Sequence, residues 1–288
     1  MRSIENGGKL AGVAIALIYL FLFRDNLVVE WVLIGIVLVT VGIPHGSLDH
    51  LLLNPEIKRV HLLKFIGKYL AIIFVYLSVW LLLPVPALLA FLAMSAYHFG
   101  QSHFIHTPLF FLKKTTYLLT GVFYLSVVFW GDFASTTEIL AGIADAGPLA
   151  PYGWYVIIGS FSISSMLIIR NLPKKWWPHL VEMILMGSLF YHLPLLLGFI
   201  LYFGFWHALP SMQVEYSALK QHFGPQGLKT FIEKMIPFTA ASILGMAAIL
   251  AIVYPRSSTE ELILLFFVLV SLISAPHIWY MNRFLESR

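Results

Sequence analysis

Long apolar stretches, separated by short polar segments, run through most of this 288-residue chain. A membrane-spanning helix needs about 17 to 25 mostly apolar residues. The pattern therefore predicts an all-α, polytopic membrane bundle of about eight to ten spanning helices, with ten as the best estimate. These helices are expected to form one membrane domain over residues 1–288. Pro84–Pro86 and Pro194 each separate two adjacent spans, and the count falls if either proline region only bends one helix. The predicted spans are Leu10–Phe23, Leu27–Pro44, Phe65–Leu83, Pro86–Phe99, Thr115–Trp130, Tyr152–Ile169, His179–Leu193, Leu195–Pro210, Ile236–Tyr254 and Leu262–Met281.

Composition supports a membrane protein and excludes several other classes. The chain is 59% hydrophobic and 11% charged, whereas a soluble domain carries about 25% charged residues. This excludes a disordered chain and an ordinary cytosolic enzyme. The chain contains no cysteine, which rules out a disulfide framework, a cysteine-bound zinc and a thiolate nucleophile. The net charge of +4 does not indicate nucleic-acid binding.

The distribution of basic residues predicts the orientation. If the N-terminus lies in the cytoplasm, all of the 18 Lys and Arg residues except Arg24 and Arg256 fall on the inner side. Cytoplasmic segments of membrane proteins carry such an excess. Loop length alone does not explain it, because the long segment Gly131–Pro151 contains no Lys or Arg. We therefore expect both termini in the cytoplasm, an even number of spans, and a multi-pass protein of the inner (plasma) membrane.

Histidines gather at the ends of the second, fourth, eighth and tenth predicted spans. Even-numbered spans all run towards the cytoplasm, so these histidines are expected at one depth near the inner face. Ionisable residues inside a span are costly and are candidates for a functional site. Neutral imidazole is a common transition-metal ligand, and a site without thiolates and with few carboxylates favours Fe(II) or Zn(II) over calcium or magnesium. The four predicted metal ligands are His45, His98, His207 and His277.

Four further residues are candidates for a supporting role. A metal-bound histidine usually donates its second N–H to a carboxylate or a carbonyl. Asp49 lies four residues after His45, and Glu182 lies near the start of the seventh span at a similar depth, so both are candidate partners. His50 and His103 lie one turn nearer the cytoplasm than the predicted ligands. Either is a candidate additional ligand, hydrogen-bond partner or interfacial residue.

A histidine-held metal in a membrane suggests oxygen chemistry on a lipid-soluble substrate. The sequence contains no G-x-S-x-G or H-E-x-x-H motif, P-loop or Rossmann fingerprint, which disfavours hydrolases and nucleotide enzymes. A di-iron lipid desaturase or hydroxylase is one alternative, and it would need His50, His103 and His106 as further ligands. A non-enzymatic metal or proton transporter is another. A transporter should have polar residues through the full depth, whereas these histidines lie on one side.

The histidine motifs also resemble those of a known family. Gly42-Ile43-Pro44-His45-Gly46-Ser47-Leu48-Asp49 is followed by Tyr97-His98-Phe99-Gly100, Phe205-Trp206-His207 and Pro276-His277. Their order and spacing resemble the Brp/Blh family of membrane β-carotene 15,15′-dioxygenases. The resemblance implies Fe(II)-dependent cleavage of β-carotene at its central double bond with O2. The products would be two molecules of all-trans-retinal, which would serve a microbial rhodopsin. It also implies that His45, His98 and His207 are iron ligands.

Two positions depart from the family pattern. Ser211 stands four residues after His207, where the family has a histidine. Gln101-Ser102-His103 occupies the stretch in which an acidic residue is expected. Either a different histidine completes the site, or this family member has an altered or lost activity. Because His277 is predicted at the same depth as the three other ligands, it is the first choice for the fourth ligand, and His103 is the second.

Overall fold

The computed structural model describes residues 2–286, so Arg288, counted above among the cytoplasmic charges, lies outside the described residues. Within this range the chain is helical and contains no strand, which confirms the all-α prediction. The α-helices are α1 (Arg2–Leu22), α2 (Leu27–Val37), α3 (Asp49–Leu53), α4 (Arg59–Leu82), α5 (Pro84–Ser102), α6 (Lys113–Gly131), α7 (Phe133–Leu140), α8 (Gly153–Asn171), α9 (Trp177–Tyr191), α10 (Leu195–Leu201), α11 (Leu209–Leu219), α12 (Gly227–Val253) and α13 (Thr259–Glu286).

Seven described helical segments are long and apolar enough to cross a membrane, and the bent pair α6–α7 raises this number to eight. This supports a polytopic membrane bundle, while the ten-span count and the orientation of the termini stay predictions. Two predicted spans do not pass the same test. Helix α9 has only 15 residues, and α5 ends in a polar turn. The seven segments are Ile4–Leu22, Leu27–Leu53, Arg59–Leu82, Gly147–Asn171, Leu195–His222, Gly224–Arg256 and Thr259–Glu286.

Both proline regions separate helices, as the ten-span pattern assumes. Leu83 adopts φ −140° and ψ 65°, so α4 ends before Pro84 and α5 begins there. The residue before a proline is pushed out of the helical region, which explains this break. The predicted end of the eighth span at Pro210 is wrong, because the helical path runs on through α11 to Leu219. A π-helical segment, η4 (Tyr202–Ala208), directly precedes α11 and shifts the hydrogen-bond register ahead of the proline.

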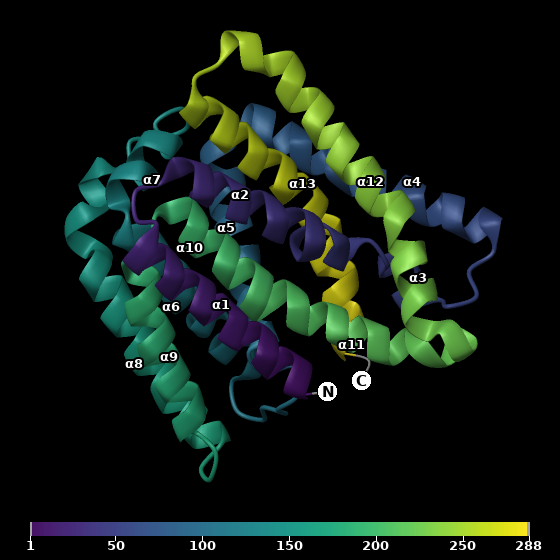
Figure 1. The fold of residues 1–288 in the computed structure, drawn as a ribbon, viewed down its shortest axis with the longest axis horizontal. Helices are drawn as coiled ribbons and strands as arrows, with labels where there is room; N and C mark the ends of the chain where they lie inside the picture. The colour runs from purple at the N-terminus through teal and green to yellow at the C-terminus, as the bar shows by residue number, and fades with distance from the viewer. Residues whose placement is uncertain (1, 287–288) are drawn as a thin grey trace. The chain divides into compact units, whose positions relative to one another are not determined.

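The described residues group into two compact units. The first unit comprises Met1–Leu38 and Ala93–Pro210, and the second comprises Val39–Leu92 and Ser211–Arg288. The single membrane domain over residues 1–288 stays a prediction. In the first unit, α6 packs along α8 and α9, and α10 packs against α2 (Figure 1).

Two glycines let α5 approach α6 very closely within the first unit. A Cβ atom at Gly100 would overlap the backbone carbonyl of Tyr117, and one at Gly121 would overlap that of Ala96. Small residues at helix crossings in membranes allow such backbone contact. The crossing fixes the last turns of α5, which carry His98.

Replacing Gly121 with Ala should destabilise the first unit. The added methyl group meets backbone rather than a mobile side chain, so the helices must move apart, at a cost of about 1–3 kcal/mol. A lowered Tm of the purified protein in detergent would report this loss. Gly159→Ala on α8 is the matched control, because no atom lies within 4 Å of its Cβ position. An unchanged Tm for Gly121→Ala would contradict the close crossing.

In the second unit, α4 and α12 both pack along α13, and Figure 1 shows α12 and α13 side by side in yellow-green and yellow. The Tyr69 hydroxyl donates to the carbonyl of Ile273 at 3.1 Å. The Trp80 indole N–H donates to Ser271 Oγ at 2.9 Å. The short helix α3 also packs on α13. These contacts hold the segment that contains His45 and Asp49 against the helix that contains His277.

Candidate metal centre

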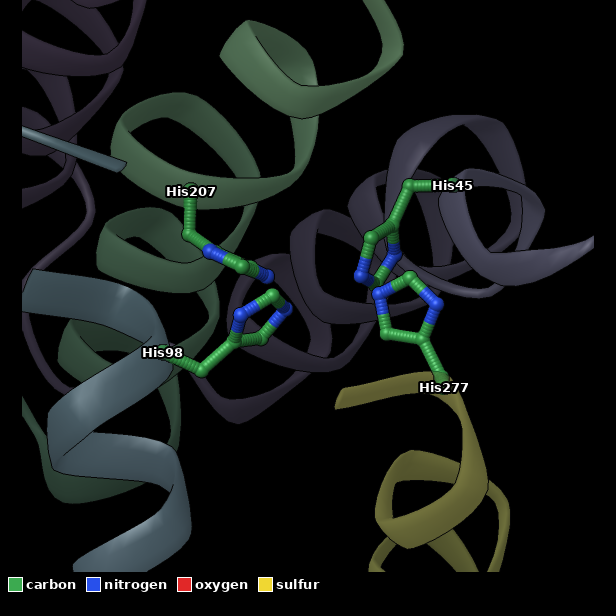
Figure 2. A group of neighbouring side chains, drawn as sticks. All are labelled: His45, His98, His207 and His277. Atoms are coloured by element: carbon green, nitrogen blue, oxygen red, sulfur yellow. The ribbon is translucent and has the colours of Figure 1, made fainter. Parts of the chain in front are cut away.

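The first unit contains one buried histidine pair, His98 and His207. Their ring centroids lie 4.5 Å apart at an interplanar angle of 69°, and a nitrogen of each ring lies within 4.8 Å of one in the other. Figure 2 shows His98 on α5 and His207 on η4 with their rings turned towards each other. Ser102 Oγ lies 2.7 Å from Nδ1 of His207 and 3.4 Å from the carbonyl oxygen of His98, to which it donates. The hydroxyl oxygen can therefore accept from Nδ1–H of His207, a tautomer in which a histidine binds a metal through Nε2.

The local backbone explains where His207 points. The π-helical segment η4 contains His207, and π-helical turns often occur at functional sites because they redirect one side chain. Gly204 in this segment permits close packing, since a Cβ atom there would overlap Cγ1 of Val37 on α2. The aromatic ring of Phe99 packs 4.5 Å from the His207 ring. The His207 ring is therefore held by packing against Phe99 and by its hydrogen bond with Ser102.

The second unit contains the other buried pair, His45 and His277. Their ring centroids lie 4.7 Å apart at 84°, and Figure 2 shows them facing each other from the turn at residue 45 and from α13. Nδ1–H of His45 donates to the carbonyl of Gly42. His277 Nδ1 lies 2.9 Å from Oδ1 and 3.1 Å from Oδ2 of Asp49, to which it donates. Both rings are thus oriented through Nδ1, as is usual for histidines that bind a metal through Nε2.

Asp49 contacts a different histidine from the one that its spacing suggests. The helical spacing predicts that Asp49 supports His45, but its carboxylate lies on His277. The reason is the backbone: residues Pro44–Gly46 form a 3-10 turn and α3 begins only at Asp49, so residues 45 and 49 do not share one α-helical face. A Cβ atom at Gly46 would lie 3.2 Å from Nδ1 of His277. Glycine at this position therefore allows the close approach of His277.

Glu182, His50 and His103 lie in other contacts. Glu182 Oε1 accepts from Trp206 Nε1 at 2.7 Å and lies 2.9 Å from Lys9 Nζ. Trp206 precedes His207 in the chain, so Glu182 supports the neighbouring turn. The His50 ring packs on Phe238 at 4.7 Å.

His103 stacks on an aromatic side chain and lies outside both pairs. Its ring lies 4.6 Å from that of Tyr124, at an interplanar angle of 3°. A ring nitrogen also lies 3.3 Å from the Tyr202 hydroxyl. That His103 is an additional ligand or a supporting residue of the metal site stays a prediction.

Sequence reasoning missed two partners of the histidines. Ser102 lies four residues after His98, a spacing that could have indicated a residue on the same helix face. The Gly42 carbonyl carries no side-chain signal, because every residue offers a backbone oxygen.

Each unit thus contains one buried pair of histidines whose ring nitrogens could hold a metal ion. The donor set fits a transition metal: it offers imidazole nitrogens without a carboxylate in either pair. Three of the rings have Nδ1 within hydrogen-bond distance of a serine, a backbone carbonyl or a carboxylate. Such partners fix the tautomer and the orientation of a metal-binding histidine. Buried groups of this kind favour a borderline cation over Ca²⁺ or Mg²⁺.

The sequence is similar to one protein family. A family model described as "Beta-carotene 15,15'-dioxygenase" matches residues 36–284, a range that contains all four histidines. A relative from Halobacterium salinarum, "Probable beta-carotene 15,15'-dioxygenase Blh", is 25% identical over 285 residues, covering 83% of this chain and 80% of that protein. "Beta-carotene 15,15'-dioxygenase" of an uncultured marine bacterium is 27% identical over 195 residues, covering 63% and 68%. No solved structure matches.

Proposed function

This chain belongs to the beta-carotene 15,15'-dioxygenase family, and we propose that it cleaves β-carotene with O2 into two molecules of all-trans-retinal. The bond between carbons 15 and 15′ would break, and each half would receive one oxygen atom as an aldehyde. The observation that carries the proposal is the set of two buried histidine pairs in the matched range. A carotenoid is insoluble in water, so an enzyme with several membrane-spanning helices is suited to take it from the bilayer.

We further propose that His45, His98, His207 and His277 together bind one Fe(II) ion. Support comes from the four buried imidazoles, three of which have a hydrogen-bond partner at Nδ1, and from the absence of cysteine in the sequence. Bound iron would supply the electrons that activate O2. The chain's own contribution is to orient three of the four rings, those of His207, His45 and His277, through Ser102, Gly42 and Asp49.

The surroundings of the histidines fit a long apolar substrate. Phe99 and Phe203 pack against the ring of His207 and exclude water from that side. A polyene offers few polar handles, so its position must be set by the shape of an apolar channel. We place the enzyme in the plasma membrane with its site near the cytoplasmic side, and the retinal would serve as chromophore of a rhodopsin. A di-iron site is less favoured, because His50 and His103 pack on aromatic rings.

The activity can be tested by producing the chain in a bacterium that accumulates β-carotene and analysing extracts by chromatography. We expect retinal as the single cleavage product. Aldehydes of two unequal lengths would contradict central cleavage, and no product from a well-produced, iron-supplied protein would contradict the proposed activity. His222→Ala is a suitable control, since His222 is exposed in the second unit and should leave the yield unchanged.

Metal analysis of the purified protein tests the shared site. If the two pairs hold one ion together, we expect about one iron per chain after purification. Two ions per chain would mean that each pair binds separately. An ion other than iron that supports full retinal formation would contradict the Fe(II) assignment.

Replacing Asp49 with Asn should weaken metal binding. Loss of a charged hydrogen-bond partner of a metal-bound histidine typically costs 10–100-fold in metal affinity or activity. We expect a loss of about this size in a chelator competition assay, because the carboxylate orients His277. Glu233→Gln on α12 is the control: it removes an exposed carboxylate whose ion-pair partner among the described residues is Lys229, at 3.8 Å. Equal affinity for both variants would remove Asp49 from the site.

A further inference from the structure

A cavity of about 610 Å³ lies in the second unit, between the beginning of α4 and the end of α13. Phe65 and Tyr280 are among the residues that line it, with ring centroids 4.9 Å apart. Its volume lies within the range of about 300–1,000 Å³ that is typical of small-molecule sites. The proposed oxygenase activity assigns no role to it.

Two lysines and one arginine are among the residues that line the cavity. Lys64 and Lys68 lie four residues apart and His61 lies one turn earlier, so the three share one face of α4. Arg283 lines the cavity from α13, and no acidic residue lines it. Within residues 2–286, neither Lys64, Lys68 nor Arg283 has a carboxylate within ion-pair distance. Their charges are therefore available to an anion from outside the chain.

Apart from Asn54 and the hydroxyl of Tyr280, the remaining lining side chains are apolar. Ala71 and Ile72 continue along α4 beyond Lys68, within a segment that is a candidate span. Trp279 borders the cavity on α13 and is 67% exposed. Exposed tryptophan is typical of the boundary between lipid headgroups and acyl chains. The cavity thus combines a cationic end with an apolar side. This lining is complementary to an amphiphile with an anionic headgroup, whereas a soluble anion would have no use for the apolar side.

We propose that this cavity binds an anionic phospholipid, with its headgroup phosphate at Lys64, Lys68 and Arg283 and an acyl chain beside Ala71 and Ile72. Basic pockets between membrane helices on the cytoplasmic side recognise such headgroups, and the basic residues here are predicted to lie on that side. The lipid would connect α4 with α13. Because the bound lipid would contact both helices, it would stabilise the second unit, including the part of α13 that carries His277.

The test uses the purified full chain in a non-ionic detergent. Phosphatidylglycerol, phosphatidylcholine or inorganic phosphate is added, and Tm and retained lipid are measured by thermal unfolding and native mass spectrometry. We expect phosphatidylglycerol to raise Tm and to be retained, and the two other additions to have little effect. The double variant Lys64→Gln/Lys68→Gln should bind phosphatidylglycerol more weakly, by about fivefold for each cation removed.

A charge-matched control separates this site from general surface charge. Lys174→Gln/Lys175→Gln removes two cations between α8 and α9, in the other unit, and should keep the full response. Equal loss in both double variants, or an equal Tm rise with inorganic phosphate, would overturn the proposal. Arg283→Gln gives an independent measurement from α13 and should also weaken retention. Since no readout depends on turnover, failure here is distinguishable from failure of the oxygenase proposal.

Discussion

His98→Ala and His45→Ala should each lower retinal formation by more than ~100-fold, since partners that merely orient a metal-bound histidine already contribute 10–100-fold. Each variant removes one ring of a different buried pair, and each remaining partner would keep its hydrogen bond to Ser102 or Asp49. The measurement is turnover of β-carotene by purified protein, with bound metal determined on the same sample.

The loss must be separated from misfolding. Both variants should keep the helical circular dichroism and the elution volume of the native protein, because a buried imidazole is replaced by a smaller apolar group. His192→Ala is the control in the first unit: this histidine is exposed, and its Nδ1 lies 2.7 Å from the Ser188 carbonyl. Retained turnover in both His45→Ala and His98→Ala would reject the proposed ligand set.

Hydropathy and proline placement predicted the helical class and most helix positions. Prolines 84 and 194 mark helix boundaries because their effect on the preceding residue is local and steric. The extension of the eighth span past Pro210 could not be predicted in the same way. It depends on the π-helical turn before the proline, and no simple sequence pattern distinguishes that turn from a regular α-helix.

The histidines were found from a single argument about depth. Every second span runs in the same direction, so the ends of the even-numbered spans are expected at one face. The four histidines chosen on this ground are those that occur as two buried pairs. Their partners were harder to predict. Asp49 was expected beside His45 on the assumption of a continuous helix, and the 3-10 turn at Pro44–Gly46 directs it to His277 instead. Hydrogen bonds to the backbone, such as that of His45 to Gly42, leave no trace in residue type.

His277→Ala should cost more than ~100-fold in retinal formation, whereas Ser211→Ala should change it by less than about threefold. His277 is buried, faces His45 and is oriented by Asp49. Ser211 occupies the position at which the family resemblance leads us to expect a fourth histidine. It is 1% exposed, and its hydroxyl has no hydrogen-bond partner among the described residues. Removing an unsatisfied buried hydroxyl costs little.

A structural role for His277 would give the same loss of activity, so a second measurement is needed. If His277 supplies a ligand atom, free imidazole added to the His277→Ala protein should restore metal binding and part of the turnover, since it can occupy the vacated volume. A residue needed only for packing would not respond to imidazole. The opposite order of effects, with Ser211→Ala severe and His277→Ala mild, would contradict His277 as the fourth ligand. It would assign the fourth position of the site to residue 211, on the helix that follows His207.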